Sequence, residues 1–172
     1  EEAYLLSLFS EKAVDKKEML LHEGQPCHYF YFVYKGALRS YCLDKQGKES
    51  TIMFALQNWW ITDMFCFLND KPAIMFIEAL QDSVVLQIHK KSLDNLLLKY
   101  PKFEKWFRVL MQNAYTREQL RVIDNLTLSA EEKYDKFLAK YPLIVNEITQ
   151  KQLASYLGIT PEFLSVIRKN KL

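Results

Sequence analysis

The sequence predicts an α+β fold, in which a strand-rich N-terminal half is followed by helices. Three observations predict it. Between Met19 and about Lys90, short runs rich in β-branched and aromatic residues alternate with turn signals. From Ser92 onward, apolar residues recur at helical spacing instead. Residues 150–171, QKQLASYLGITPEFLSVIRKNK, have the pattern of two short helices joined at a glycine.

Composition limits the class of protein. The chain has 172 residues, 49% of them hydrophobic, which is enough for one medium domain, or a domain with an appendage, around a sizeable core. It has no apolar run of membrane-spanning length, and the opening EEAYLL lacks a secretory pattern. Cys27, Cys42 and Cys66 form no CxxC pair, which favours reduced thiols over a disulfide or a zinc site. We therefore expect a cytoplasmic protein with no membrane partner, no metal and no cofactor.

The first part of the chain is predicted to be a short helix followed by strands. Residues 1–12 have the pattern of an amphipathic helix. The runs YFYFVY, LRSYCL, STIMFAL, AIMFIEAL and SVVLQI then each have the length of a strand. Gly24, Gly36 and Gly47 fall at the breaks, where glycine supplies the positive φ that tight hairpins need. This pattern favours an antiparallel barrel or a sandwich.

Helices are predicted next. KSLDNLLLKY reads as a short helix that ends before Pro101, and a long helix covers about residues 102–127. Apolar residues from Phe103 to Tyr115 follow one face of this helix for over three turns. Further apolar residues extend to other faces: Leu120, Val122, Ile123 and Leu126. One face can cover the strands and the other can pair with a second copy, unless the whole surface packs inside one monomer.

A domain boundary is predicted near Thr127–Ser129. The segment SAEE places Ser129 at a helix N-cap with Glu132 three residues later, which is the capping-box pattern. Pro142 follows the end of this helix. The predicted units are residues 1–127 and residues 128–172.

The closing segment fits a DNA-reading helix-turn-helix. Counted from Gln150, its fifth residue is the small Ala154, where a second helix must cross closely, and its ninth is Gly158, which tolerates a left-handed backbone. Thr160 can cap the second helix, and Pro161 suits its first position. Apolar residues occupy the positions that lock the helices together: Leu153, Leu157, Ile159, Leu164 and Ile167. The alternative is a plain helical hairpin with a C-cap glycine.

The second helix is expected to enter the major groove with its N-terminal part. Glu162 can accept from a cytosine amino group, Ser165 can pair with several base edges, and Val166 can contact a thymine methyl. The outward residues are predicted to be Thr160, Pro161, Glu162, Ser165, Val166 and Lys169, and the phosphate contacts Thr149, Lys151, Arg168, Lys169 and Lys171. Residues 148–172 carry a net charge of +3 and the remainder −1, which fits an acidic partner.

Three segments carry a resemblance to a known family: QLASYLGITPEFLSVIRK, SAEEKYDKFLAKYP and HEGQPCHYFYFVYKGALRSY. Together with the order of the elements, they resemble the Crp/Fnr family of bacterial transcription regulators over nearly the whole chain. The resemblance implies a jelly-roll, cyclic-nucleotide-binding-like β-barrel, a dimerisation helix over 102–127, and a winged helix-turn-helix whose wing is missing from this chain. It also implies a homodimer on near-palindromic DNA and RNA polymerase as a partner.

The sequence departs from the family at the ligand site and on the recognition helix. Thr62 and Asp63 stand near the Gly-Glu pair of the cyclic-nucleotide-binding members, and Ala73 and Ile74 stand near their Arg-Ser pair. Without the arginine a buried phosphate lacks its charge partner, so we expect no binding of cyclic AMP. The cysteines and histidines do not reproduce iron–sulfur or haem ligand patterns. Pro161 and Val166 replace recognition arginines, whereas Glu162 is kept, so sequence preference is expected to differ.

The family's ligand position is expected to hold an apolar effector pocket. Tyr115 and Gln119 of the long helix are expected to close it. The other predicted pocket residues are Trp59, Trp60, Thr62, Asp63, Phe65, Phe67, Ile74 and Phe76. Alternatively these aromatic side chains fill the pocket, which leaves a dimerising scaffold without an effector.

Two rival functions remain. One is a ligand-sensing dimeric barrel whose C-terminal helices bind protein rather than DNA. The other is a cupin-like metal enzyme, which needs clustered histidines and carboxylates such as an HxH pair. The sequence has no HxH pair, so we expect no catalytic site.

Overall fold

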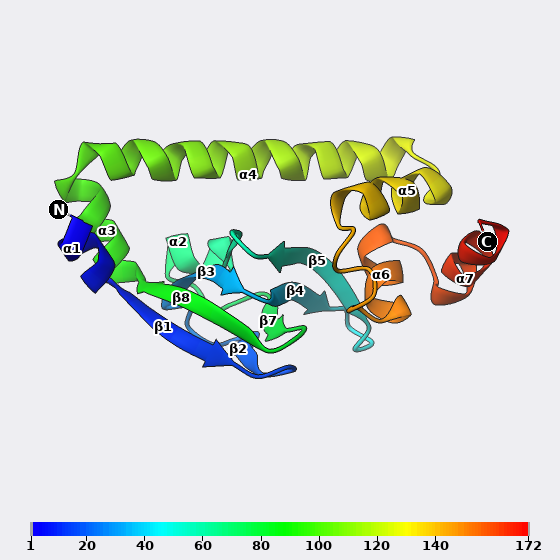
Figure 1. Cartoon of the computed structure of the whole chain (residues 1–172), viewed down its shortest axis with the longest axis horizontal. Coiled ribbons are helices and arrows are strands. Elements are labelled where there is room, and N and C mark those ends of the chain that lie inside the picture. The colour runs from blue at the N-terminus through cyan, green and yellow to red at the C-terminus, as the bar shows by residue number, and fades with distance from the viewer. Residues whose placement is uncertain (1, 172) are drawn as a thin grey trace.

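The structure, a computed structural model, describes residues 2–171, and its long helix lies along one side of the strands (Figure 1). The strands are β1 (Phe9–Val14), β2 (Met19–Leu21), β3 (Tyr29–Lys35), β4 (Ala37–Leu43), β5 (Glu49–Leu56), β6 (Trp60–Ile61), β7 (Phe76–Ala79) and β8 (Ser83–His89). The helices are α1 (Glu2–Ser7), α2 (Met64–Asn69), α3 (Lys90–Lys99), α4 (Pro101–Thr127), α5 (Ala130–Lys140), α6 (Gln150–Leu157) and α7 (Pro161–Asn170). The predicted α+β class is confirmed.

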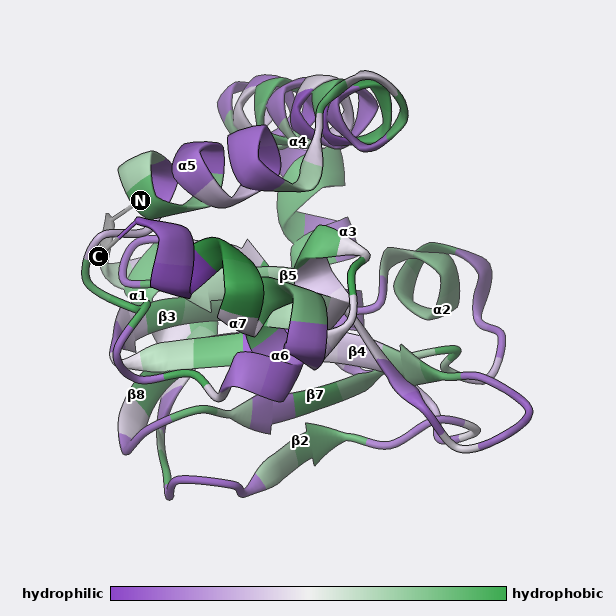
Figure 2. Cartoon of the chain, turned by 90° about the vertical axis from the view of Figure 1, so that its right-hand side faces the viewer, coloured by the Kyte–Doolittle hydropathy of each residue, from purple (hydrophilic) through white to green (hydrophobic). Residues whose placement is uncertain are grey.

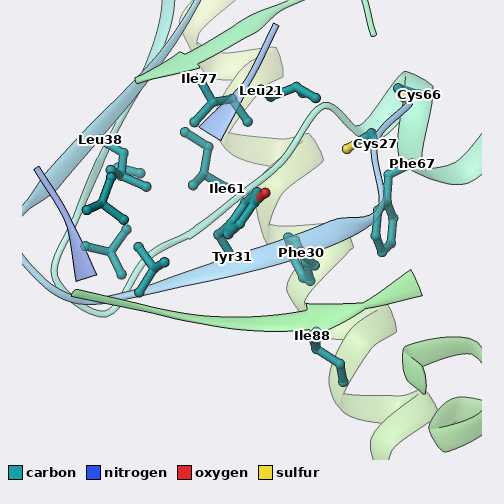
Figure 3. Close-up of a cluster of buried hydrophobic side chains, with 14 of the residues drawn as sticks. Leu21, Cys27, Phe30, Tyr31, Leu38, Ile61, Cys66, Phe67, Ile77 and Ile88 are labelled. Atoms are coloured by element: carbon teal, nitrogen blue, oxygen red, sulfur yellow. The ribbon is translucent and has the colours of Figure 1, made fainter. Parts of the chain in front are cut away.

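The strands form two four-stranded antiparallel sheets, in the orders β1-β8-β3-β6 and β2-β7-β4-β5. Residues of both sheets contribute to one core, because Val33 and Ile88 of the first and Leu38 and Ile77 of the second belong to the same buried cluster. Figure 3 shows this cluster. The two sheets are therefore the walls of a jelly-roll barrel that encloses its apolar side chains.

A second core lies on the outer face of the sheet β2-β7-β4-β5. Ala37, Phe54 and Leu80 of this sheet region are buried together with Tyr134 and Leu153 of the C-terminal helices. Figure 1 shows α5, α6 and α7 gathered at one end of the strands. The helices after residue 128 are thus docked on the barrel, a contact that the sequence pattern did not predict.

The predicted helix over residues 1–12 is wrong in its second half. The helix α1 ends at Ser7, and Phe9–Val14 forms the strand β1. This strand pairs with β8 from Phe9↔Ile88 to Val14↔Ser83. The pairing joins residues about seventy positions apart, so local periodicity could not reveal it.

Gly36 also differs from its predicted role. It was expected in a tight hairpin, but β3 and β4 belong to different sheets, and Gly36 turns the chain between them with φ 96°. Gly47 does lie in the turn of the β4–β5 hairpin, with φ 77°. The two glycines therefore have different roles: Gly36 allows the close approach of Ser83, and Gly47 allows the hairpin turn.

Replacing Gly36 with alanine should destabilise the barrel by roughly 2–4 kcal/mol, because a strained backbone and a steric clash add together. A Cβ there would lie 2.2 Å from Ser83 Oγ and 2.8 Å from Ser83 Cα. Gly47→Ala is the matched control, since a Cβ at Gly47 meets nothing within 4 Å. Urea unfolding measures both variants, and equal losses of stability would contradict the role of Ser83.

The helix α4 has two apolar sides, as predicted. Phe103 and Phe107, with Leu110 and Met111, pack against the barrel core. The predicted residues Leu120, Val122, Ile123 and Leu126 are exposed, the last with 81% of its surface. Tyr115 was predicted on the face of Phe103, but it is exposed on the outer side and does not pack against the barrel core. None of the helices in residues 2–171, α4 included, has both the length and the apolar character to cross a bilayer.

Candidate nucleic-acid interface

The helices α6 and α7 form the predicted helix-turn-helix. Gly158 has φ 69°, and the amide of the next residue, Ile159, donates to Ala154 O at 3.0 Å, which closes α6. Thr160 Oγ1 then accepts from the amide of Phe163 at 3.2 Å and caps α7. The side chains between the helices are buried as predicted: Leu153, Ala154, Leu157, Leu164 and Ile167.

One face of α7 is open to solvent. Leu164 and Ile167 point inward, so the helical period places Glu162, Ser165, Val166 and Lys169 on the opposite side, and all four are exposed. Thr160 precedes this face, Pro161 is half-buried, and Arg168 is exposed on its flank. Thr149 and Lys151, at the start of α6, are exposed as well. The residues predicted to read and hold DNA are thus accessible, apart from part of Pro161.

Gln150 is an interface residue that the sequence pattern did not single out. Its Nε2 donates to Pro161 O at 2.8 Å and to the Ser165 hydroxyl, and that hydroxyl donates to Pro161 O at 3.0 Å. The bonds link positions 11 and 15 residues apart, which local spacing does not show. Ser165 is therefore held in place and its hydroxyl proton is engaged, which leaves mainly its lone pairs for a base edge.

The basic side chains at the end of α7 are not equivalent. Lys171 was predicted to hold a phosphate, but its Nζ forms an ion pair with Asp135 of α5. Arg168 and Lys169 form no ion pair within residues 2–171. Their charges, unlike that of Lys171, are therefore available to an acidic partner.

Polar contacts join α6 to the barrel. Ser155 Oγ accepts from the amide of Thr51 at 3.2 Å and lies 2.8 Å from Thr51 Oγ1. Arg121 of α4 donates to Ile52 O at 2.7 Å. The Tyr156 ring lies 5.1 Å from that of Phe54 on β5, between centroids. The strand β5 therefore meets both α4 and α6.

A buried arginine lies beside this contact. Arg39 of β4 has 4% of its side chain exposed, and it pairs with Glu49 at 2.7 Å and with Glu78 at 2.5 Å. Its Nη1 donates to Thr51 Oγ1 at 3.3 Å, and its guanidinium lies 4.2 Å from the centre of the Tyr41 ring. Burial among these groups raises the pKa of Tyr41, with the charge of Glu78 adding to the effect. The cluster links the strands β4, β5 and β7. It includes Thr51, which forms hydrogen bonds with Ser155 of α6.

A cavity of about 470 Å³ lies between the barrel and α4. Of the predicted pocket residues, Trp59, Trp60 and Thr62 line it, and the aromatic rings border an open space rather than filling it. Other lining residues include Phe30, Met53, Leu110 and Met111.

The remaining predicted pocket residues lie elsewhere. Phe65 and Ile74 are exposed, and Phe67 packs in the core beside Phe30, at 5.8 Å between ring centroids (Figure 3). Phe76 stacks on Tyr41. Tyr115 is 70% exposed on the outer side of α4, and Gln119 is also exposed, so neither is among the residues that line the cavity. Most of the residues predicted for the pocket therefore do not line this cavity, and its role as an effector site stays a prediction.

Asp63 is a structural residue rather than a lining residue. It is fully buried, and its carboxylate accepts from the amides of Cys66 at 3.1 Å, Ile74 at 2.7 Å and Met75 at 3.1 Å. The backbone donors of this loop are thus already used by a carboxylate. This arrangement supplies a second physical reason, beside the missing arginine, to expect no cyclic phosphate here.

The thiols and carboxylates that the structure describes do not gather into a metal site. Within residues 2–171, no group of three or more His, Cys, Asp or Glu side chains has a suitable arrangement. Cys27 Sγ lies 3.0 Å from Thr62 Oγ1, and burial raises the pKa of the Cys66 thiol to about 11. The cupin-like alternative therefore finds no support in the described residues.

Comparison with known proteins gives one family and several similar proteins. Residues 11–100 match the family described as cyclic nucleotide-binding domain. The chain is 26% identical to the regulatory protein HlyX of Actinobacillus pleuropneumoniae, covering 90% of this chain and 68% of that protein. It is 25% identical to the fumarate and nitrate reduction regulatory protein of Vibrio cholerae, covering 90% and 66%. The chain thus spans 60% to 68% of the length of such curated relatives.

The fold also has solved counterparts. The structure of FixK2 from Bradyrhizobium japonicum superposes with a TM-score of 0.81, at 21% sequence identity, over 94% of this chain and 83% of that one. This likeness covers both the barrel and the C-terminal helices.

Proposed function

The chain belongs to the cyclic nucleotide-binding domain family, and from this premise we propose that it is a homodimeric, DNA-binding transcriptional regulator of the Crp/Fnr type, working in the cytoplasm. The observation that carries the proposal is the open face of α7. Glu162, Ser165, Val166 and Lys169 share that face, and Arg168 flanks it without an ion-pair partner in the described chain. A DNA-binding helix needs side chains that can contact base edges in the groove, with cations beside them that can contact the phosphates.

The helix α4 supports the homodimer. Its outer side exposes Tyr115, Val122, Ile123 and Leu126, whereas its inner side is covered by the barrel. Exposed apolar side chains on a 27-residue helix are buried most simply by the same side chains of a second copy. A two-fold pair presents two α7 helices, which suits a near-palindromic site.

The barrel cavity supports an effector other than cyclic AMP. Its wall is largely apolar, and Asp63 occupies the loop amides beside it. An apolar effector bound there contacts both the barrel and α4, including Leu110 and Met111. RNA polymerase is the further partner that regulation of transcription implies.

Selection of bound sites from random DNA, with and without cell extract, tests DNA binding, the half-site and effector dependence together. A selected sequence with two related half-sites supports the proposal. Binding only to a protein from the extract, with no DNA shift at any salt concentration, would instead favour the protein-binding alternative.

Substituting Arg168 and Lys169 with alanine should weaken binding to the selected DNA roughly 10- to 100-fold. The slope of the logarithm of the binding constant against the logarithm of the salt concentration should also fall, by about one unit for each phosphate that the variant no longer neutralises. Fluorescence anisotropy between 50 and about 200 mM salt measures both effects. The matched control is Lys91→Ala with Lys105→Ala, two exposed lysines outside the helix-turn-helix. An equal effect of both pairs would mean that only net charge matters.

A further inference from the structure

A second cavity, of about 460 Å³, lies between the C-terminal half of α4, α5 and α6. Figure 2, viewed from the C-terminal end, shows α5 beneath α4, with α6 lower in the view. The cavity shares Trp59, Asn113 and Arg117 with the barrel cavity but is otherwise lined by different residues. Its size lies in the range that binds small organic molecules.

The wall of this cavity is strongly basic. It contains Arg117, Arg121, Lys133, Lys136 and Lys140, with Asp124 as the acidic lining residue. Asp124 is already paired with Lys136, at 2.6 Å. Such a surplus of positive charge in a concave site attracts anions.

Among residues 2–171, one other carboxylate forms ion pairs with these cations. Glu118 forms an ion pair with Arg121 at 3.0 Å and approaches Arg117 at 3.9 Å. Lys133 and Lys140 have no carboxylate partner within residues 2–171. Burial lowers the pKa of Lys140, and the charges of Arg117, Arg121 and Lys136 lower it further against the opposing effect of Glu118.

Aromatic rings form another part of the wall and contact the cations. Arg117 lies 4.8 Å from the centre of the Trp59 ring, Lys140 lies 5.1 Å from that of Tyr141, and Arg121 lies 5.6 Å from that of Tyr156. Guanidinium planes and aromatic rings both stack on flat rings. Phe137, Leu120 and Leu157 add apolar surface.

From this combination we propose that the cavity binds a small organic anion of mononucleotide size, which places a phosphate among Lys133, Lys140 and their neighbours and packs a flat ring against the aromatic wall. Such a ligand touches α4, α5 and α6 at once, so it holds the helix-turn-helix unit in place against α4. The binding itself does not depend on the proposed function, whereas an effect on DNA affinity does.

The first test is a titration of the purified chain with ADP in the absence of DNA. Calorimetry and tryptophan fluorescence measure the binding. Adenosine supplies the ring without the charge, and pyrophosphate supplies the charge without the ring. We expect ADP to bind at least about tenfold more tightly than either part, because stacking and charge-assisted bonds each add affinity. No binding of ADP at about 1 mM overturns the proposal, and so does pyrophosphate binding as tightly as ADP.

The second test localises the binding. Lys133→Gln with Lys140→Gln should raise the Kd for ADP roughly tenfold or more, because both lysines line this cavity and neither lines the barrel cavity. The control pair Lys91→Gln with Lys105→Gln removes the same charge from exposed sites elsewhere and should leave the Kd within about twofold. Equal weakening by both pairs, or none by the first, assigns ADP to another site and overturns the proposal. Because these titrations contain no DNA, a failure of the proposed function leaves their outcome unaffected.

Discussion

Glutamate at both Ile123 and Leu126 is expected to convert the protein to a monomer and to lower its affinity for the selected DNA by about 10²- to 10⁴-fold, the advantage that two linked binding units have over one. Both side chains are exposed on the outer side of α4, and neither packs against the barrel. Facing glutamates would bring like charges together in a surface that must lose its water. Light scattering on a sizing column measures the mass, and anisotropy measures the DNA affinity.

The matched control is Leu98→Glu with Leu143→Glu. Each of these leucines is 85% exposed and lies outside α4, so the control adds the same charges without touching the proposed dimer surface. The control should remain dimeric and bind DNA normally. A wild-type chain that is monomeric at micromolar concentration, or an Ile123 and Leu126 variant that still forms dimers, would contradict the role of α4.

Replacing Arg39 with methionine should lower the free energy of unfolding by roughly 1–3 kcal/mol, the cost of leaving partly buried acceptors without their charged donor, since 15% of the Glu78 side chain and 31% of the Glu49 side chain are exposed. Glu49 and Glu78 both lose the guanidinium, and Thr51 loses a hydrogen bond. Urea unfolding measures the loss. Thr51 also forms hydrogen bonds with Ser155, so the loss should loosen the contact of α6 with the barrel. We therefore expect easier cleavage by protease between the barrel and α6.

A rescue variant separates charge from packing. Adding Glu49→Gln and Glu78→Gln to Arg39→Met removes the unpaired carboxylates and should recover most of the lost stability, since a buried ion cluster can often be replaced without a large cost. If the triple variant is as unstable as Arg39→Met, then the packing of Arg39 on Tyr41 matters more than its ion pairs.

The helices after Ser92 were predictable because their signals are local. The capping box of Ser129 and Glu132 is present as predicted, and the left-handed Gly158 closes α6. The open face of α7 follows from the 3.6-residue period once Leu164 and Ile167 are taken as buried. These features need only a few consecutive residues.

What could not be predicted depends on contacts between distant segments. The strand β1 exists because β8 lies beside it, and Gly36 is needed because Ser83 crosses within contact distance. The pocket residues illustrate a second reason. In the six-residue helix α2, Cys66 and Phe67 turn inward, so the helical period turns Phe65 to solvent. A resemblance that aligns segments does not determine which way each side chain points.

The docking of α6 on β5 has a consequence for the operator. Ser155 contacts Thr51, and Arg121 donates to Ile52 O, so in the proposed dimer the sheet would set the distance of each α7 from α4. Two reading helices must stand about 34 Å apart to reach successive turns of the major groove. The outer surface of the barrel then determines the spacing between the two half-sites, whereas α7 determines which bases are bound. Substitutions at Thr51 would change the preferred spacer length and leave the preferred bases the same.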